Sequence, residues 1–296
     1  MAHPVQGIIP PLTTPFTPTG KVYEKGLRQL VDFHIDRGVQ ALFICGTYGL
    51  SAIMSLEQRQ RVHEIVTAQV RQRIAVIVHA GAASTAETVQ LALHAESVGA
   101  DCVACIPPFY HAHDEREVLA HYRAVVKAVN VPVYAYNNPK VSGFTITPSM
   151  LRKLADLGVA GIKDSSMSYM DFLDMVLAME DRPDFRLIVG TEALALPAFL
   201  IGARGCISGL SNVFPEHVVR LWAALEAGKY EEAARMGLRL GRARQILQRS
   251  GSPNAACYAG LAARGIDAGV PKLPTLPLTD EKTAEMLAGW RALGLL

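Results

Sequence analysis

Val159-Ala160-Gly161-Ile162-Lys163 is a short apolar run that ends in a lysine. Apolar runs of about four to eight residues are typical of strands that are buried on both faces of a parallel sheet. The run therefore places an ammonium group at the end of a buried strand. Burial lowers the pKa of an amine and leaves more of it as a nucleophilic free base. The structural alternative is a lysine that reaches solvent or pairs with Asp164, since ion pairs also perturb lysines.

Seven more runs of this kind alternate with amphipathic stretches along the chain. With the Lys163 run they predict eight strands, at residues 7–10, 41–45, 74–79, 102–106, 133–136, 159–163, 186–190 and 205–208. A helix is expected in each gap, which gives successive βα units and a parallel sheet. Eight right-handed βα units close most naturally into a barrel, so the predicted fold is an α/β (β/α)8 TIM barrel.

Helix start signals in the sequence support these predicted positions of the strands and helices. Ser55 with Gln58, and Ser84 with Glu87, have the spacing of a capping box, and Thr147 precedes a proline that suits the first helical position. After about residue 215 no strand is predicted, and helices are expected at residues 215–227, 230–249, 257–264 and 280–293. The proline-rich stretch 269–278 is predicted to be a surface connector. The expected domains are a catalytic barrel, 1–224, and a C-terminal helical extension, 225–296.

Composition excludes several classes of partner. The chain has 296 residues, half of them hydrophobic, and a net charge of +2 without long blocks of one sign. It can therefore bury a sizeable core, and it lacks the basic footprint expected of a protein that binds nucleic acid or an anionic membrane. The first residues, 1–7, do not have the pattern of a secretory leader, and no segment has the apolar length of a membrane span. A cytoplasmic protein with small-molecule partners is predicted.

The cysteines point to a reducing compartment. There are five, an odd number, and all lie in apolar runs. Cys102 and Cys105 have a C-x-x-C spacing, but residues i and i+3 of a strand face opposite sides. They are therefore predicted to be core thiols rather than a redox pair or a chelate.

Polar residues follow the predicted strands at their carboxyl ends, which is where TIM barrels have their active sites. Gly46-Thr47-Tyr48 follows the second strand, Tyr110 the fourth, and Tyr136 and Lys163 close the fifth and sixth. An iminium formed by Lys163 with a 2-oxo acid is an electron sink that lets the adjacent C–C bond form or break. A phenol such as Tyr136 can move the proton, and backbone amides of the Thr47 turn can hold the carboxylate.

These residues belong to longer motifs that resemble one family over nearly the whole chain. It is the family of pyruvate-dependent class I aldolases that includes dihydrodipicolinate synthase, N-acetylneuraminate lyase and 2-keto-3-deoxygluconate aldolase. The similar stretches are residues 7–16, Gly46-Thr47-x-Gly49, Gly99-Ala100-Asp101, Tyr136-Asn137-x-Pro139 and 161–166. The resemblance implies a lyase that forms a covalent imine between Lys163 and pyruvate and uses no other cofactor.

Further roles follow from the resemblance alone. It implies that Tyr136 is the general acid/base, that Gly46, Thr47 and Tyr48 form the turn that binds the pyruvyl carboxylate, and that Tyr110 reaches into a neighbouring subunit's site. It also implies a homotetramer, built as a dimer of dimers. The remaining residues expected to bind substrate are Pro10, Val141, Thr191, Glu192 and Ser208.

Departures from the family pattern bear on the substrate. Val141 stands where dihydrodipicolinate synthases have an arginine that binds the aldehyde's carboxylate, and Lys140 cannot supply the same two-pronged contact. Leu50 resembles the form found in sugar-acid aldolases, and Thr191-Glu192 could bind substrate hydroxyls. The leading predicted substrates are therefore pyruvate with the aldehyde of a 2-keto-3-deoxy sugar acid. Tyr48 fits neither group, and its ring could stack on an aromatic aldehyde.

Four alternatives stay open at this point. They are a 4-hydroxy-tetrahydrodipicolinate synthase, a Schiff-base dehydratase, an aromatic hydratase-aldolase and a 2-oxo-acid sensor without catalysis, although a sensor has no need of an activated amine. A metal-dependent aldolase would have to use His79, His111 and His113, which no carboxylate cluster completes. No metal site and no nucleotide motif are therefore predicted.

Overall fold

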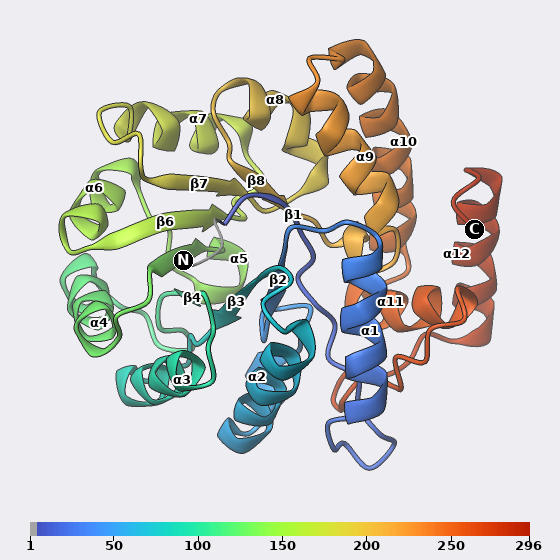
Figure 1. The fold of residues 1–296 in the computed structure, drawn as a ribbon, viewed down its shortest axis with the longest axis horizontal. Coiled ribbons are helices and arrows are strands. Elements are labelled where there is room, and N and C mark those ends of the chain that lie inside the picture. The colour runs from blue at the N-terminus through green and yellow to red at the C-terminus, as the bar shows by residue number, and fades with distance from the viewer. Residues whose placement is uncertain (1–4) are drawn as a thin grey trace.

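The eight predicted strands are all present and all parallel in the computed structural model, which describes residues 5–296. Neighbouring strands pair in the order β1-β8-β7-β6-β5-β4-β3-β2, and the barrel that they form is seen in Figure 1. Each strand begins and ends within one residue of its predicted bounds. They are β1 (Gly7–Ile9), β2 (Ala41–Ile44), β3 (Ala75–His79), β4 (Cys102–Cys105), β5 (Val133–Asn137), β6 (Val159–Asp164), β7 (Arg186–Val189) and β8 (Gly205–Ile207).

Backbone hydrogen bonds outside the regular ladders close the barrel between β1 and β2. The amide of Gln40 donates to the carbonyl of Ile8 at 3.1 Å, and the amide of Phe43 donates to the carbonyl of Pro10 at 2.9 Å. The amide of Leu12 returns a bond of 2.9 Å to the carbonyl of Phe43. The prediction of a TIM barrel is confirmed.

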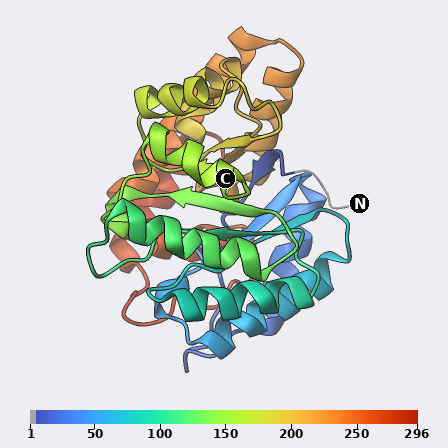
Figure 2. The ribbon, with the colours of Figure 1, turned by 90° about the vertical axis from the view of Figure 1, so that its left-hand side faces the viewer.

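Helices cover the outside of the barrel, as Figures 1 and 2 show. Ser55 forms the complete capping box with Gln58, whereas the Ser84 hydroxyl accepts the Glu87 amide as a simple cap. Thr147 caps its helix as predicted. The barrel helices are α1 (Glu24–Asp36), α2 (Leu56–Val70), α3 (Thr85–Ser97), α4 (Glu115–Ala128), α5 (Pro139–Ser142), α6 (Pro148–Asp156), α7 (Tyr169–Ala178) and α8 (Ala195–Leu200).

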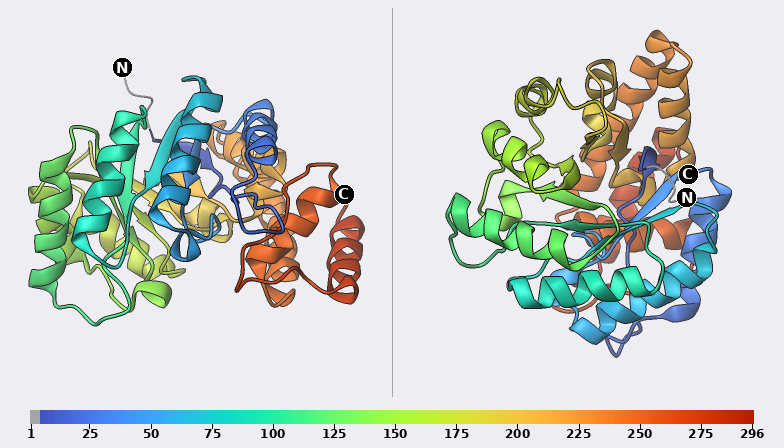
Figure 3. Two further views of the ribbon diagram at one scale, coloured as in Figure 1. Left: turned by 90° about the horizontal axis from the view of Figure 1, so that it is seen from below. Right: turned by 60° about the vertical axis from the view of Figure 1, so that its left-hand side comes forward.

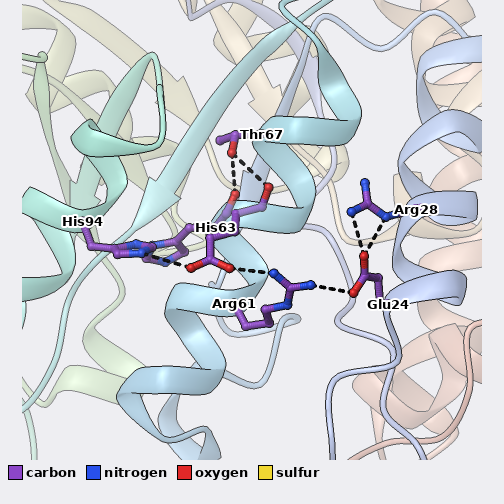
Figure 4. Close-up of polar contacts among 7 residues, drawn as sticks. Glu24, Arg28, Arg61, His63, Thr67 and His94 are labelled. Carbon is purple, nitrogen blue, oxygen red and sulfur yellow. Dashed lines mark hydrogen bonds and ion pairs between the residues drawn. The ribbon is translucent and has the colours of Figure 1, made fainter.

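Ion pairs join the outer faces of α1, α2 and α3 (Figure 4). Arg61 of α2 lies 2.7 Å from both Glu24 and Glu64, and Glu24 also pairs with Arg28 of its own helix at 2.7 Å. Glu64 lies 3.6 Å from His94 of α3. Because the arginine and glutamate side chains of these pairs are 37–50% exposed, each pair contributes at most about 1 kcal/mol. Packing, rather than this network, holds the helices on the barrel.

The apolar residues form two separate cores. One fills the inside of the barrel and includes Phe43, Cys102, Ile106 and Tyr136, while the other lies between the strands and the helices and includes Cys105. Cys102 and Cys105 therefore face opposite sides of β4, as strand alternation requires. All five cysteines are free and buried, so the prediction of core thiols is confirmed.

The C-terminal helices pack against one side of the barrel (Figure 3). They are α9 (Pro215–Glu226), α10 (Tyr230–Arg249), α11 (Pro253–Ala263) and α12 (Asp280–Ala292). Helix α11 begins four residues before its predicted start, because Ser252 caps it and Pro253 occupies the first turn. The extension is confirmed, while a domain boundary between residues 224 and 225, inside α9, stays a prediction.

Two further predictions concern membrane or leader segments and the proline-rich connector. Within residues 5–296 no helix is long and apolar enough to cross a membrane. The prediction that no leader is present depends in part on residues 1–4, which lie outside the described residues. The segment 269–278 contains no helix or strand, as predicted for a connector.

Candidate active site

Lys163 lies inside the barrel near the carboxyl end of β6, and only 5% of its surface is exposed. Its Nζ lies 3.9 Å from the centroid of the Phe43 ring and 4.0 Å from that of Tyr136. Burial lowers the pKa of Lys163 from its ordinary value of 10.5, an effect only partly offset by Tyr136. The side chain therefore does not escape to solvent, and it has the environment of an activated amine.

Asp164 does not pair with Lys163, so the structural alternative for this lysine is wrong. Its carboxylate accepts hydrogen bonds from Asn137 Nδ2 and Ser166 Oγ, each at 2.7 Å. Asn137 also accepts the amide of Ile146 through Oδ1 at 3.0 Å. Asn137 and Asp164 are paired in register across β5 and β6, directly after Tyr136 and Lys163. This buried link fixes the two catalytic candidates side by side.

Tyr136 holds its phenol oxygen among polar groups close to the amine. Asn138 Nδ2 donates to Tyr136 Oη at 2.9 Å, and Thr47 Oγ1 lies 3.2 Å from the same atom. Burial raises the pKa of this phenol, but the positive charge of Lys163 and the hydrogen bonds of its neighbours outweigh burial, and the net pKa is lowered. The phenol is thus suited to give up and recover a proton beside the amine.

A tight turn follows β2 and brings Thr47 to this phenol. Its two flanking residues, Cys45 and Leu50, have φ values of 56° and 58°, which non-glycine residues seldom adopt. Gly46 is required at its position, because a Cβ there would lie 2.5 Å from the Phe43 ring. The amides of Thr47 and Tyr48 donate no hydrogen bond within the part of the chain that the structure describes. They are therefore free to bind a carboxylate.

Two adjoining cavities meet at Thr47 and Tyr136. The inner pocket, of about 90 Å³, contains Lys163 and is lined by Pro11, Thr47, Tyr48, Tyr136, Asn138, Lys163, Ser165, Met167, Gly190, Ile207 and Gly209. The outer cavity, of about 250 Å³, is lined by Thr47, Leu50, Ser51, Ala52, Ile53, His79, Ile106, Phe109, Tyr136, Val141, Asn254 and Thr275. The arrangement has room for a 2-oxo acid at the amine and a second molecule beyond the phenol.

The structure brings only part of the predicted site together. Gly46 forms the turn and Val141, 48% exposed, stands at the rim of the outer cavity. Pro10 is buried with its carbonyl bonded to Phe43, and the next residue, Pro11, lines the inner pocket instead. Tyr110 lines neither cavity, since its side chain is 91% exposed.

Glu192 and Ser208 do not line the inner pocket, and Glu192 lines a separate cavity together with Arg244. Ser208 Oγ donates to Glu192 Oε2 at 2.6 Å, and Arg244 Nε lies 3.7 Å from Glu192 Oε1. Thr191 Oγ1 accepts the amide of Ala193. The wall on this side includes Tyr48, whose phenol has a pKa raised by burial and, to a smaller extent, by Cys257 and Glu192. None of Thr191, Glu192 and Ser208 lines the pocket around Lys163.

Several residues of the site were not predicted, and four of them show why. Phe43 lies on the inward face of β2, a position that strand alternation could have identified. Asn138 occupies the variable position of the Tyr-Asn-x-Pro motif. Asn254 and Thr275 come from the C-terminal extension, where Asn254 Nδ2 donates to the Thr47 carbonyl at 3.1 Å. No local pattern in the sequence indicates this last contact.

The histidines considered as metal ligands are dispersed. His79 is buried and its Nδ1 is 2.9 Å from the carbonyl of Cys45, while His113 pairs with Glu117 at 3.3 Å. His111 is exposed. Among residues 5–296, no three His, Cys, Asp or Glu side chains are placed to hold one metal ion.

The chain is similar to known proteins over nearly its whole length. A profile of the Dihydrodipicolinate synthetase family matches residues 4–291. The chain is 32% identical over 292 residues to a 4-hydroxy-tetrahydrodipicolinate synthase of Geotalea uraniireducens, covering 98% of this chain and 99% of the relative. It is 34% identical over 293 residues to an uncharacterized DapA-like lyase of Halobacterium salinarum, covering 99% and 95%. The structure of YagE, a prophage protein of E. coli K12 in complex with pyruvate, superposes with a TM-score of 0.96 at 28% identity over 99% of both chains.

Proposed function

Because the chain belongs to the dihydrodipicolinate synthetase family, we propose that it is a pyruvate-dependent class I aldolase that forms its imine on Lys163. Enzymes of this family are lyases that use a lysine Schiff base with pyruvate and no metal cofactor. The observation that carries the proposal is the buried amine of Lys163 held 4.0 Å from the centre of the Tyr136 ring. A sensor of 2-oxo acids would need neither the amine nor the phenol.

Imine formation comes first. The free amine of Lys163 attacks the 2-oxo carbon of pyruvate, and the carbonyl oxygen leaves as water after two proton transfers. The free amides of Thr47 and Tyr48 are available to hold the pyruvyl carboxylate. The lowered pKa of Lys163 favours this step, because it increases the fraction of unprotonated amine at neutral pH.

The C–C step then depends on Tyr136. In synthesis the Tyr136 phenolate removes a methyl proton, which converts the iminium into an enamine. The enamine attacks the aldehyde carbon, and the aldehyde oxygen takes that proton from the Tyr136 phenol. In cleavage the phenolate removes that proton from the hydroxyl and the electrons return to the iminium. Asn138 and Thr47 both contact Tyr136 Oη and can stabilise the phenolate by donating to it.

The next question is which aldehyde reacts with pyruvate. The prediction of a 2-keto-3-deoxy sugar acid is supported by Leu50 and by the Thr191-Glu192 pair. In the structure, however, the Glu192 carboxylate is bonded to Ser208 and faces Arg244. The synthase alternative lacks its arginine at Val141. The dehydratase alternative would use the same amine and phenol, and product analysis separates it from the aldolase.

We also propose that the enzyme assembles into a homotetramer in which Tyr110 serves a neighbouring site. The support is the family resemblance together with the placement of Tyr110, which is 91% exposed and has a φ of 82°. An aromatic side chain held outward in a disfavoured conformation is unusual in a free surface loop. A cytoplasmic location stays a prediction.

The decisive experiment is chemical trapping of the imine. The protein is incubated with pyruvate and borohydride, and peptides are mapped by mass spectrometry. We expect one pyruvyl adduct, on the peptide that contains Lys163, and its loss in Lys163→Ala but not in the exposed neighbour control Lys140→Ala. An adduct spread over surface lysines, or aldol turnover by Lys163→Ala, would disprove the mechanism.

A further inference from the structure

His79 is the last residue of β3, and its buried ring contacts groups that the proposed mechanism uses. Its centroid is 5.6 Å from that of Tyr136, edge to face, and 5.9 Å from that of Phe43. These are the two rings that contact the amine of Lys163. His79 Nδ1 also lies 2.9 Å from the carbonyl oxygen of Cys45. The imidazole therefore joins the rings around the amine to the backbone that leads into the turn after β2.

The bond to Cys45 supports a backbone conformation that is disfavoured. Because a carbonyl oxygen only accepts, Nδ1 of His79 carries the proton of the neutral ring and donates it. Cys45 has a φ of 56°, and such conformations persist only where surrounding contacts hold them. The next residues are Gly46 and Thr47, which begin the turn whose free amides are available for the pyruvyl carboxylate. The imidazole is thus a support for the geometry of this turn.

Arg59 of α2 fixes the backbone from which this imidazole projects. Its guanidinium donates to the carbonyl of His79 at 2.7 Å and to that of Gly81 at 3.0 Å. The Arg59 carbonyl in turn accepts the Cys45 thiol at 3.9 Å. Arg59 is only 4% exposed, and burying a guanidinium against carbonyls rather than an acid is costly. Its planar fork allows it to hold both carbonyls at once, and so to fix the end of β3.

His79 stays neutral beside these cations. Burial lowers its pKa to about 3, with further lowering by the charges of Arg59 and Lys163, while the bond to Cys45 opposes the shift. The nearby His63 is also neutral, because burial lowers its pKa well below the ordinary value. One tautomer of His79, with the proton on Nδ1, is therefore kept at every working pH. The ring acts through its position, and the pH dependence of imine formation belongs to Lys163.

We propose that His79, fixed by Arg59, is a positioning residue of the imine site: its Nδ1–H sets the turn that receives the carboxylate of the 2-oxo acid, and its ring supports the two rings around Lys163. This rests on the proposed imine chemistry. All of these groups belong to one chain, so the inference does not depend on what a neighbouring subunit contributes. The two contacts can be tested separately, because one needs a donor and the other needs a ring.

The test measures the rate of pyruvate trapping on Lys163 with cyanoborohydride against pyruvate concentration. His79→Phe keeps a ring but removes the donor, so we expect the half-saturating pyruvate concentration to rise about tenfold and the maximal rate to stay within about twofold. His79→Asn keeps a donor near the place of Nδ1 but removes the ring. It should keep the half-saturating concentration within about threefold, while the pH of half-maximal trapping rises by about one unit as water reaches the amine.

The matched control is His121→Phe, which removes a comparable imidazole outside the site. His121 is 2% exposed, and its Nδ1 lies 3.0 Å from Thr85 Oγ1. This variant should change neither the half-saturating pyruvate concentration nor the pH of half-maximal trapping. An unchanged concentration in His79→Phe, or an equal rise in His121→Phe, overturns this inference alone. Absence of the pyruvyl adduct in the wild-type protein overturns the proposed function and this inference together.

A double variant tests whether Arg59 acts through His79. Arg59→Lys keeps a charge but loses the fork that holds two carbonyls, and should raise the half-saturating pyruvate concentration about fivefold. If both residues act through the same contact, adding Arg59→Lys to His79→Phe should cost no more than about twofold beyond His79→Phe alone. Effects that multiply would overturn the assignment of Arg59, and circular dichroism checks that each variant is folded.

Discussion

The amine of Lys163 is placed against two aromatic faces rather than against a carboxylate. The rings of Phe43 and Tyr136 lie at similar distances from Nζ, and the two rings meet edge to face with centroids 5.7 Å apart. Ring faces attract an ammonium group, but far less strongly than the water that they displace. Burial therefore dominates, and the pKa of Lys163 is lowered.

The pH dependence of imine formation follows from this shift. Only the neutral amine attacks pyruvate, so the rate should rise with pH through the pKa of Lys163 and level off above it. Because burial lowers that pKa, we expect the half-maximal rate clearly below pH 10.5, the ordinary value. Initial rates of adduct trapping with cyanoborohydride between pH 6 and pH 10 check this. A rate that still rises steeply at pH 10, as for an exposed lysine in a peptide, would contradict it.

Tyr136 carries the second residue-level prediction. Tyr136→Phe keeps the ring against Lys163 but removes the oxygen that contacts Thr47 and Asn138. We expect turnover to fall by about 10²–10⁴-fold, the usual loss when a general acid/base is removed. Pyruvate should still be trapped on Lys163, which separates a chemical role from misfolding. Unchanged turnover would assign the proton transfer to another group.

At the scale of elements, the strands were predictable because each is a continuous apolar run. A parallel strand buried on both faces must be apolar throughout, and the run from Val159 shows this to within one residue of β6. The start of α11 was missed because Ser252 and Pro253 lie outside the apolar part of the helix. Long-range contacts were also missed: nothing near Asn254 in the sequence indicates that its amide holds the turn at Thr47.

The hydrogen bond between Asn137 and Asp164, which joins the ends of β5 and β6, can be tested by mutation. Asn137→Asp would place two buried carboxylates where Asn137 Nδ2 now donates to Asp164 at 2.7 Å. We expect a loss of unfolding free energy of about 3–5 kcal/mol at pH 7, measured by urea denaturation. The exposed change Gln90→Glu, on α3, serves as the control and should cost under about 0.5 kcal/mol.

The sign of the pH effect follows from the carboxyl groups. Burial already raises the pKa of Asp164 above 3.8, and a second carboxylate raises the pKa of the pair further. A group whose folded pKa exceeds its unfolded pKa binds more protons when folded, so stability falls as pH rises between the two values. The loss in Asn137→Asp should therefore shrink as pH is lowered from 7 toward 4. A loss that is equal at both pH values would mean that geometry, not charge, is responsible.

At the scale of the molecule, the site is assembled from segments that are far apart in the chain. Thr47 follows β2, Lys163 lies on β6, and Asn254 and Thr275 belong to the C-terminal extension. The extension is thus part of the site and not only a support for the barrel. Sequence motifs supplied the amine, the phenol and the turn, whereas Asn254 and Thr275 reach the outer cavity through contacts that no motif records.

The proposed homotetramer leads to a prediction about the whole molecule. If Tyr110 acts in the site of a neighbouring subunit, Tyr110→Phe should lower turnover by about tenfold or more, although each chain keeps its own Lys163 and Tyr136. Light scattering on the wild-type protein should give the mass of four chains of 32.0 kDa. A monomer with full turnover would contradict both the assembly and the role of Tyr110.

Complementation distinguishes a shared site from a merely structural tyrosine. A Lys163→Ala chain retains Tyr110, and a Tyr110→Phe chain retains Lys163, so a mixed dimer contains one site with both groups. If the chains pair at random, about a quarter of all sites become intact. Co-expression of the two variants should therefore give more turnover than the two proteins made separately and then combined without exchange of subunits. Equal turnover would show that Tyr110 acts within its own chain or not at all, because only a residue lent across an interface can be supplied by a partner that has lost its own lysine.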